Sequence, residues 1–282
     1  LNPLMKKRVV IIGGGFAGTY VARKLQNHYN VTLIDSKDYF EFTPSVLRTI
    51  VEPEHIKKIQ SLHKNYLNKA VVVRGNVKEV AKKYITVSGK KFPYDYLVIS
   101  SGSEYNSPMK GKDIVIAARA KEFRKYSEKL RKANSVLIVG GGLVGVELAA
   151  EIAEKYSEKQ VFIVEGGKEL IGRNPKKARE CARKFLEKRK VKIIFNELVT
   201  KNKGNVYNKG TKIKADLVFL CTGIKPNSLF LRKNLSKSLD ERGFVIVNKH
   251  MQIKGFSNVF AAGDITDVRE EKTAQNAEMQ AE

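Results

Sequence analysis

The sequence contains the same glycine-rich turn twice, each time directly after a short apolar segment. Residues 8–12 are almost entirely apolar and β-branched, and Gly13-Gly14-Gly15-Phe16-Ala17-Gly18 follows them. Residues 135–139 repeat the pattern, and Gly140-Gly141-Gly142-Leu143-Val144-Gly145 follows. Continuous apolar runs of this length are typical of parallel strands that are covered on both faces. The repeated unit therefore predicts an α/β fold with two similar halves.

Three glycines in each turn stand at the positions of the dinucleotide-binding fingerprint. The first makes the tight turn, the second lets the backbone approach a diphosphate, and the third lets the following helix pack on the strand. The start of that helix adds free amide groups and a positive dipole end. The fingerprint positions are Gly13, Gly15 and Gly18 in the first turn, and Gly140, Gly142 and Gly145 in the second. Two complete units predict two nucleotide sites.

A carboxylate ends the second strand of each unit. Asp35 comes 22 residues after Gly13, and Glu165 comes 25 residues after Gly140. This spacing is close to the roughly 20 residues expected for a side chain that accepts hydrogen bonds from an adenosine ribose. Glu165 should accept from the 2′-hydroxyl of NADH and repel the 2′-phosphate of NADPH, with Lys168 as a partial counterweight. We therefore expect NADH to be preferred over NADPH.

Three further strands lead into glycines. Residues 94–102 and 215–223 each contain an acid, an apolar strand, a small residue and a final glycine, which is Gly102 or Gly223. A last strand over residues 258–262 leads into Gly263-Asp264 and then the start of a polar helix. An acid beside free helix amides can bind a polyhydroxyl chain such as the ribityl arm of a flavin. The same dipeptide is also common as a turn and cap.

Two dinucleotides in one chain indicate electron transfer between a nicotinamide and a flavin. We expect an α/β fold of two nested Rossmann-like domains. The FAD-binding domain would comprise residues 1–112 and 226–282, and the NAD(P)H-binding domain residues 113–225. The first unit is assigned to FAD because it shares its domain with Gly263 and Asp264.

Four segments resemble a known family, the FAD-dependent pyridine nucleotide oxidoreductases. This family includes type II NADH:quinone dehydrogenases and apoptosis-inducing-factor-like proteins. The four segments are most similar to the ferroptosis suppressor branch, which contains NAD(P)H:quinone reductases that carry FAD. They comprise residues 7–18, 42–48, 217–228 and 257–269. The resemblance implies an FAD-dependent NAD(P)H:quinone-type oxidoreductase that passes hydride from NADH to FAD and then electrons to a quinone-like acceptor.

The resemblance also assigns residues to the two cofactors. It implies that Arg48, the backbone of Val77 and Asp264 join residues 13–18 around FAD. Residues 140–145, together with Glu165, would hold the nicotinamide nucleotide.

Glu147 is the predicted catalytic residue. It lies two residues after Gly145, on the first turn of the second unit's helix, in the otherwise apolar window 143–150. A carboxylate in such a window is costly without a partner. The helix start can itself stabilise a negative charge, so a role as a mere dipole partner is the alternative. The resemblance favours a place near nicotinamide and flavin, where the carboxylate positions NADH and assists proton movement to the acceptor.

The cysteine pattern departs from many relatives, which place a redox cysteine after the first unit. Here Phe42-Thr43-Pro44 is followed by Ser45, and the two cysteines are Cys181 and Cys221. This pattern argues against disulfide reductase and thiol-peroxidase chemistry, because a hydroxyl cannot replace a redox thiolate. It also argues against a disulfide framework and a metal site.

Residues 274–280 match a quinone-side element of type II dehydrogenases, except that methionine replaces one glutamine.

The chain is strongly basic, with 53 Lys and Arg against 29 Asp and Glu and a net charge of +24. Residues 173–192 are the densest stretch and predict a helix with one apolar stripe. Its basic face is either simply solvated or a patch for anionic lipid or nucleic acid. One alternative function is reduction of an acidic redox protein such as ferredoxin or rubredoxin. Another is nucleic-acid binding, which the single aromatic of the stretch disfavours.

The ends of the sequence bear on location and assembly. Residues 5–12 imitate a signal peptide, but the glycines that follow make them the first strand. No run is long enough to span a membrane, so we expect a cytoplasmic protein, or one peripheral to the inner face of an anionic membrane. The first methionine is Met5, and the chain stops at Glu282 inside an expected helix. We therefore expect a truncated chain that lacks its C-terminal domain, which in relatives mediates homodimerisation or membrane docking.

Overall fold

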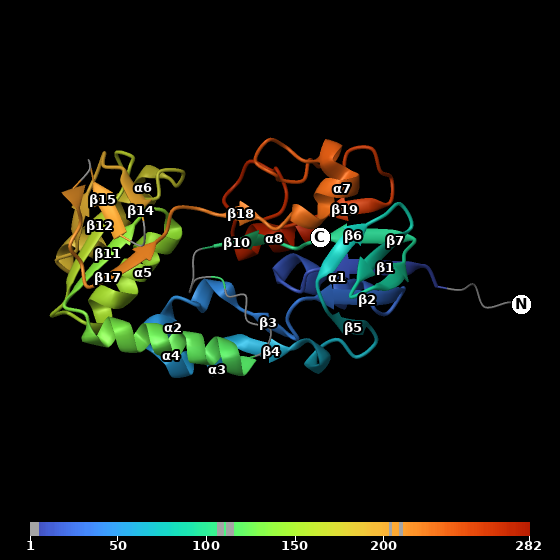
Figure 1. Cartoon of the computed structure of the whole chain (residues 1–282), viewed down its shortest axis with the longest axis horizontal. Helices are drawn as coiled ribbons and strands as arrows, with labels where there is room; N and C mark the ends of the chain where they lie inside the picture. The colour runs from blue at the N-terminus through green and yellow to red at the C-terminus, as the bar shows by residue number, and fades with distance from the viewer. Residues whose placement is uncertain (1–5, 106–109, 111–115, 203–204, 209–210) are drawn as a thin grey trace, which may run out of the picture.

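Two parallel sheets form the centres of two α/β units that lie side by side (Figure 1). The structure is a computed structural model, and it describes residues 6–105, 110, 116–202, 205–208 and 211–282. The first sheet has the strand order β19-β9-β1-β2-β5, and the second has the order β13-β12-β11-β17. Each unit begins with a strand, a glycine turn and a helix. The predicted α/β class with two Rossmann-like units is confirmed.

The first sheet is covered on both faces because β1 presents alternate side chains to two cores. Val9 and Ile11 pack toward α1, whereas Val10 and Ile12 pack toward a three-stranded antiparallel sheet. Ile11 is completely buried. The elements of the first sheet and its helix are β1 (Arg8–Ile12), α1 (Phe16–Leu25), β2 (Asn30–Asp35), β5 (Val71–Arg74), β9 (Tyr96–Ile99) and β19 (Val259–Ala261). The antiparallel strands are β6 (Val77–Val80), β7 (Tyr84–Val87) and β8 (Lys90–Pro93).

The second unit repeats this arrangement. In β11, Val136 and Ile138 face one core while Leu137 and Val139 face the other. Its main elements are β11 (Ser135–Val139), α5 (Leu143–Lys155), β12 (Gln160–Val164), α6 (Lys176–Lys188), β13 (Lys192–Ile194) and β17 (Leu217–Leu220). A further antiparallel sheet consists of β14 (Val199–Asn202), β15 (Asn205–Asn208) and β16 (Thr211–Lys212).

The chain crosses between the two units twice, and the crossings run side by side. β10 (Ser103–Glu104) pairs antiparallel with β18 (Lys225–Pro226). After β18 the chain returns to the first unit, where β19 joins the edge of the first sheet beside β9. The second sheet is therefore nested inside the sequence of the first unit. The domain boundary predicted at residue 112 falls outside the described residues.

Helix α4 (Ile116–Lys132) lies below the second unit in Figure 1 and packs on α2 (Arg48–Val51), a short helix beside a small hairpin of the first unit. Arg119 on this helix is completely buried. Its guanidinium donates two hydrogen bonds of 3.1 Å to Glu41 and one of 2.5 Å to Glu122. The hairpin and the short helices beside it are β3 (Tyr39–Glu41), β4 (Gln60–Leu62), α2 (Arg48–Val51) and α3 (Ile56–Ile59). This buried ion pair ties α4 to the first unit.

The C-terminal segment differs from the sequence prediction. Gly263 and Asp264 follow β19 as expected, but no helix begins there. The chain first makes turns, and α7 (Arg232–Leu235) and α8 (Ala274–Ala281) are the α-helices described after β18. Helix α8 begins after Thr273, whose hydroxyl accepts from the amide of Asn276 and so caps the helix. The predicted polar helix therefore starts about ten residues later than expected.

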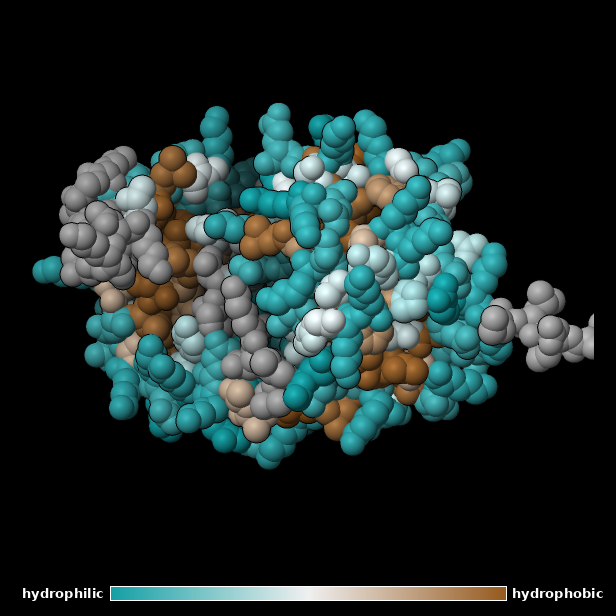
Figure 2. All heavy atoms as spheres, turned by 45° about the vertical axis from the view of Figure 1, so that its right-hand side comes forward, coloured by the Kyte–Doolittle hydropathy of each residue, from teal (hydrophilic) through white to brown (hydrophobic). Residues whose placement is uncertain are grey.

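The surface carries the net positive charge. The face in Figure 2 is mostly hydrophilic, with smaller apolar areas between polar side chains. The predicted basic helix is α6, and its apolar stripe runs through Ala178, Ala182 and the completely buried Leu186. Phe185 is covered by the guanidinium of Arg189, which lies 3.5 Å from the ring centroid. Among the described helices, none combines the length and apolar character required to cross a membrane.

The buried ion pair of α4 allows a stability prediction. Arg119→Met should leave the carboxylate of Glu41 buried and uncompensated, lowering the free energy of unfolding by about 3–5 kcal/mol. Arg124→Met is the matched control on the same helix, because Arg124 is exposed and lies 3.8 Å from an exposed Glu54. Its effect should stay below about 1 kcal/mol. Urea unfolding curves measure both, and equal midpoints for the two variants would show that the buried pair does not stabilise the fold.

Candidate functional site

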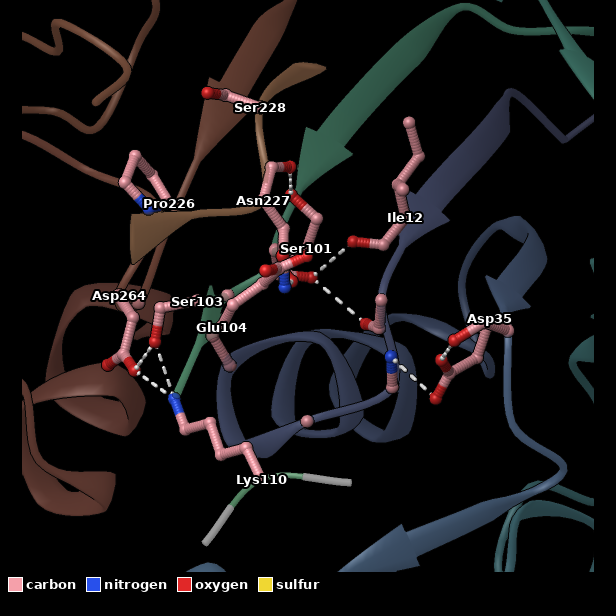
Figure 3. A pocket seen from close by; sticks show the side chains of 18 of the residues that line it. Ile12, Asp35, Ser101, Ser103, Glu104, Lys110, Pro226, Asn227, Ser228 and Asp264 are labelled. Atoms are coloured by element: carbon pink, nitrogen blue, oxygen red, sulfur yellow. Dashed lines mark hydrogen bonds and ion pairs between the residues drawn. The ribbon is translucent and has the colours of Figure 1, made fainter. Parts of the chain in front are cut away.

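A cavity of about 950 Å³ opens at the carboxyl edge of the first sheet. The first glycine turn, Asp35, Val77 and Asp264 all line it. Asp35 and Asp264 lie on opposite sides of the cavity (Figure 3). Its walls come from the ends of β1, β2, β9 and β19, from the β10–β18 crossing and from the start of α8. Ligand sites in open parallel sheets lie at this edge. The predicted site residues that line it are Gly13, Gly14, Gly15, Phe16, Ala17, Asp35, Val77, Gly102, Gly263 and Asp264.

Each glycine of the first turn has a different structural explanation. A Cβ on Gly18 would lie 1.8 Å from the carbonyl oxygen of Gly13, so α1 could not pack so closely on β1. Gly13 has φ +96°, and a Cβ there would lie 2.2 Å from the carbonyl oxygen of Ser100. Gly15 has φ −78°, and its Cβ would meet open space. Since neither packing nor backbone conformation requires a glycine at this second fingerprint position, Gly15 fits the close approach of a ligand.

Asp35 is anchored by one oxygen. Its Oδ2 accepts from the amide of Gly14 at 3.1 Å and lies 3.0 Å from Nε2 of His63. Its Oδ1 has only longer contacts, at 3.4 Å to the Ser36 hydroxyl and 3.3 Å to the Lys37 amide. The side chain therefore keeps acceptor capacity for a ligand hydroxyl, as its predicted role requires.

Asp264 lies at the other end of the cavity, 14% exposed. Burial alone would raise the pKa of its carboxyl, but Lys110 at 2.6 Å, Ser103 at 2.7 Å and the charge of Lys272 outweigh it. The pKa of Asp264 therefore lies below its ordinary value, and the group stays ionised as an acceptor. Figure 3 shows Lys110 and Ser103 pointing at the same carboxylate oxygen.

Several basic side chains converge on this cavity from segments that carry no motif. They come from the turn after β2, from both crossings, from the start of α7 and from the loops that follow α7 and precede α8. These residues are Lys37, Lys110, Lys225, Arg232, Arg242 and Lys272. The acidic lining residues are Asp35, Glu41, Glu104 and Asp264. The excess of positive charge fits a ligand that carries phosphates. Sequence analysis missed these cations because only the fold brings them together.

The second glycine turn has the same geometry as the first. A Cβ on Gly145 would lie 2.0 Å from the oxygen of Gly140, Gly140 has φ +108°, and Gly142 faces open space. Both oxygens of Glu165 already accept backbone hydrogen bonds, at 2.6 Å from Gly141 and 2.7 Å from Gly167. Gly223 follows β17 with φ +99°. These residues lie together at one edge of the second sheet.

A smaller cavity of about 280 Å³ lies where α2 and the turn before it face α5. Arg48 lines this cavity and not the larger one, and its Nη2 lies 3.0 Å from Glu151. Ser45 and Nε2 of His55 form a hydrogen bond of 2.7 Å in the same cavity. Glu147 is the remaining acid there, and partial burial together with the charge of Glu151 raises its pKa. The site thus joins titratable groups from both units.

In the part of the chain that the structure describes, no group of three or more His, Cys, Asp and Glu side chains is arranged so that it could hold a metal ion. Cys181 is exposed and Cys221 is buried, and neither is in a disulfide. Burial raises the pKa of the Cys221 thiol to about 12, so this thiol is not a ready nucleophile.

Comparison with known proteins extends these observations. Apoptosis-inducing factor homolog B of Dictyostelium discoideum is 37% identical over 303 residues, which cover 96% of this chain and 78% of that protein. Ferroptosis suppressor protein 1 of Homo sapiens is 32% identical over 297 residues, covering 97% of this chain and 78% of that protein.

Solved structures show the same fold at lower identity. The sulfide:quinone oxidoreductase of Aquifex aeolicus has a TM-score of 0.80 and 20% identity, with 98% of this chain and 74% of that chain covered. NDH2 from Plasmodium falciparum in complex with NADH has a TM-score of 0.74 and 21% identity, with 93% of this chain and 64% of that chain covered.

The family model described as pyridine nucleotide-disulphide oxidoreductase matches residues 7–281. This match and the sequence relatives confirm the resemblance drawn from the glycine turns and the segments around them. The two nested units described above, each with its own glycine turn, are the architecture that such a match implies. The chain belongs to the pyridine nucleotide-disulphide oxidoreductase family of oxidoreductases.

Proposed function

We propose that this protein is a flavoprotein that passes hydride from NADH to FAD and then electrons to a quinone-like acceptor. The observation that carries the proposal is the larger cavity, because it connects a glycine turn and a ribose-type acid at one end with Asp264 at the other. A dinucleotide with a polyhydroxyl arm needs this sequence of partners along its length. FAD would supply the redox chemistry, and the protein supplies binding, orientation and electrostatics.

Each end of the larger cavity would bind a different part of FAD. Amides of residues 13–18 and the start of α1 would donate to the diphosphate, while Asp35 accepts from the adenosine ribose. The ionised Asp264 would accept from the ribityl hydroxyls, and the backbone of Val77 would contact the adenine end. On this proposal, residues 1–112 and 226–282 form the FAD domain and residues 113–225 the NAD(P)H domain.

The nicotinamide nucleotide would bind on the second unit. Its diphosphate would lie on residues 140–145, and Glu165 would face the ribose next to Gly223. Because Glu165 is an acid that two backbone amides hold in place, a 2′-phosphate would meet a fixed negative charge. The proposal therefore favours NADH over NADPH.

The quinone-like acceptor is proposed for two reasons. The chain has a serine where many relatives carry a redox cysteine, and its sequence resembles that of quinone reductases. Ser45 stands in the smaller cavity where many relatives carry a redox cysteine, so no thiol can relay electrons there. A direct transfer from flavin to a small molecule fits this arrangement. The ferroptosis suppressor resemblance and the name of the sulfide:quinone oxidoreductase favour a quinone. The net charge of +24 would support contact with an anionic membrane, on its cytoplasmic side.

The same charge favours a second candidate, reduction of an acidic redox protein. A basic surface steers an acidic carrier toward its binding site, and the association slows as salt screens the charges. The two candidate functions are distinguished by measuring the rate of NADH oxidation with a quinone as acceptor and with an acidic carrier protein as acceptor, each at low and at high salt. Quinone reduction should change little with salt, whereas carrier reduction should fall steeply.

The first prediction concerns FAD. Asp35→Asn removes a charged acceptor for the ribose, so the dissociation constant for FAD should rise about tenfold or more. Asp216→Asn is the control, because Asp216 makes the same kind of backbone hydrogen bonds on the second unit, away from the cavity. Fluorescence titration of flavin-free protein measures both. A wild-type protein that takes up no FAD would contradict the proposal.

The second prediction concerns the electron donor. The wild-type protein should have a higher kcat/KM for NADH than for NADPH, and Glu165→Gln should narrow the difference, because it removes the charge that repels a 2′-phosphate. Steady-state kinetics with both donors and one quinone provide the values. A preference for NADPH in the wild-type protein would rule out the proposed role of Glu165.

The third prediction concerns Glu147. Glu147→Gln keeps the shape and removes the charge, so it should slow flavin reduction by NADH or flavin reoxidation by quinone, with FAD content and Tm unchanged. Glu154→Gln is the control on the same helix, because Glu154 is exposed. The raised pKa of Glu147 means that it releases its proton at a higher pH than an ordinary glutamate. The wild-type rate should therefore change in that pH range and the Glu147→Gln rate should not.

Stopped-flow measurement of the two half-reactions decides the role of this side chain. If Glu147→Gln equals the wild type in both half-reactions and at every pH, Glu147 is a dipole partner of α5 only.

A further inference from the structure

Ser45 and His55 form a polar pair in the smaller cavity to which the function proposed above gives no task. The hydroxyl of Ser45 lies 2.7 Å from Nε2 of His55. Ser45 ends the turn Thr43–Ser45 and His55 ends the turn Pro53–His55, one on either side of α2. Each turn has a proline near its start, and Ile50 of α2 is completely buried. A short and rigid stretch of chain therefore holds the two side chains face to face.

The turn that carries Ser45 borders both cavities. Thr43 lines the larger cavity, whereas Pro44 and Ser45 line the smaller one. Glu147, which is proposed to act at the reaction centre, lines the smaller cavity as well. The pair of Ser45 and His55 therefore lies at the border of the cavity that is proposed to bind FAD.

His55 is open to water, in contrast to the other histidine of this region. Both ring nitrogens of His63 have partners, at 3.0 Å in Asp35 and 2.5 Å in Tyr66, and the ring is completely buried. His55 is partly exposed, and among the residues that the structure describes its ring has a hydrogen-bond partner at Nε2 alone. The ring of His55 can therefore exchange protons with water.

The other polar groups of the smaller cavity do not form such a connection. Arg48 does not give up its proton, and its guanidinium donates two hydrogen bonds, of 3.2 and 3.0 Å, to Glu151. Partial burial and the charge of Glu151 raise the pKa of Glu147, so this side chain can hold a proton. Within the described part of the chain, however, Glu147 has no hydrogen bond or ion pair. Ser45 and His55 thus provide the hydrogen-bonded route from water into this cavity.

The proposed reaction needs one proton that NADH does not supply. A quinone becomes a hydroquinone by taking up two electrons and two protons, whereas the hydride of NADH carries two electrons and one proton. The second proton must come from water through the protein. A hydroxyl can pass it on, because it donates one proton while it accepts another. Ser45 stands where many relatives carry a redox cysteine, and its hydroxyl can carry protons but not electrons.

We infer that Ser45 and His55 form the route by which the second proton reaches the acceptor. The inference rests on the proposed reduction of a quinone. Oγ of Ser45 gives its proton to the acceptor oxygen that the two electrons have made negative, so one O–H bond breaks and another forms. Nε2 of His55 gives its proton to Oγ, and water returns a proton to the ring. The 2.7 Å contact fits these steps, because either atom can be the donor, depending on the ring tautomer.

The first test compares two acceptors that differ in their need for protons. A quinone takes up two protons, whereas ferricyanide takes up electrons alone. His55→Gln and Ser45→Ala should each lower the ratio of the quinone rate to the ferricyanide rate about tenfold or more, in stopped-flow reoxidation of the NADH-reduced protein. Ser45→Thr keeps a hydroxyl and should restore the ratio. His250→Gln is the matched control, because His250 is exposed and lines neither cavity.

The outcomes of this comparison separate the inference from the proposed function. If His55→Gln and Ser45→Ala keep the wild-type ratio, the inference is overturned while the proposed function stands. If the wild-type protein, loaded with FAD and supplied with NADH, reduces no quinone, the proposed function is overturned and the inference with it.

A second test needs neither FAD nor turnover. The chain has four histidines, so ¹⁵N nuclear magnetic resonance of their ring nitrogens gives a small set of signals. In the flavin-free protein the Nε2 signal of His55 should move in Ser45→Ala, which loses the hydrogen bond, and much less in Ser45→Thr, which keeps it. The signals of His63 should stay in place in both variants. A His55 signal that is the same in the wild type and in Ser45→Ala would overturn the inference.

Discussion

The close approach of backbone to backbone at the two glycine turns is the contact on which the rest of the structure depends. A Cβ on Gly18 or Gly145 would overlap the carbonyl oxygen at the start of its own turn. Without a side chain there, α1 and α5 pack on their sheets with their first amides at the carboxyl edge. The other strands of each sheet are parallel and end at the same edge, so the acids and glycines that follow them gather around one opening.

The same local geometry is used twice with different surroundings. In the first unit the turn meets a deep cavity lined by cations, and the acid that ends β2 is paired with a buried histidine. In the second unit the acid is held by two backbone amides above an apolar side chain. The smaller cavity places Glu147 of the second unit beside Arg48 and Ser45 of the first. This chain thus surrounds the two copies of one repeated unit with different side chains beneath and around each turn.

Local signals in the sequence were sufficient to predict the turns, the strands that lead into them and the acids that follow. In each unit these features lie within about 30 consecutive residues, so the spacing of the glycines and the acid in the sequence is enough to identify them. The cations of the larger cavity and the buried His63 could not be predicted, because the segments that carry them meet only through the sheet topology. The position of Arg48 in the smaller cavity has the same cause, since it depends on a contact between distant segments. The start of α8 is instead set locally, by the cap that Thr273 provides.

The most direct measurement is an anaerobic titration of the FAD-loaded protein with NADH, followed by flavin absorbance. It tests at once whether the larger cavity holds a flavin and whether the second unit delivers hydride to it. The proposed function predicts that the oxidised flavin spectrum disappears as NADH is added and returns when a quinone is supplied. A flavin that stays oxidised in excess NADH would contradict the assignment of the two glycine turns to two cooperating nucleotides.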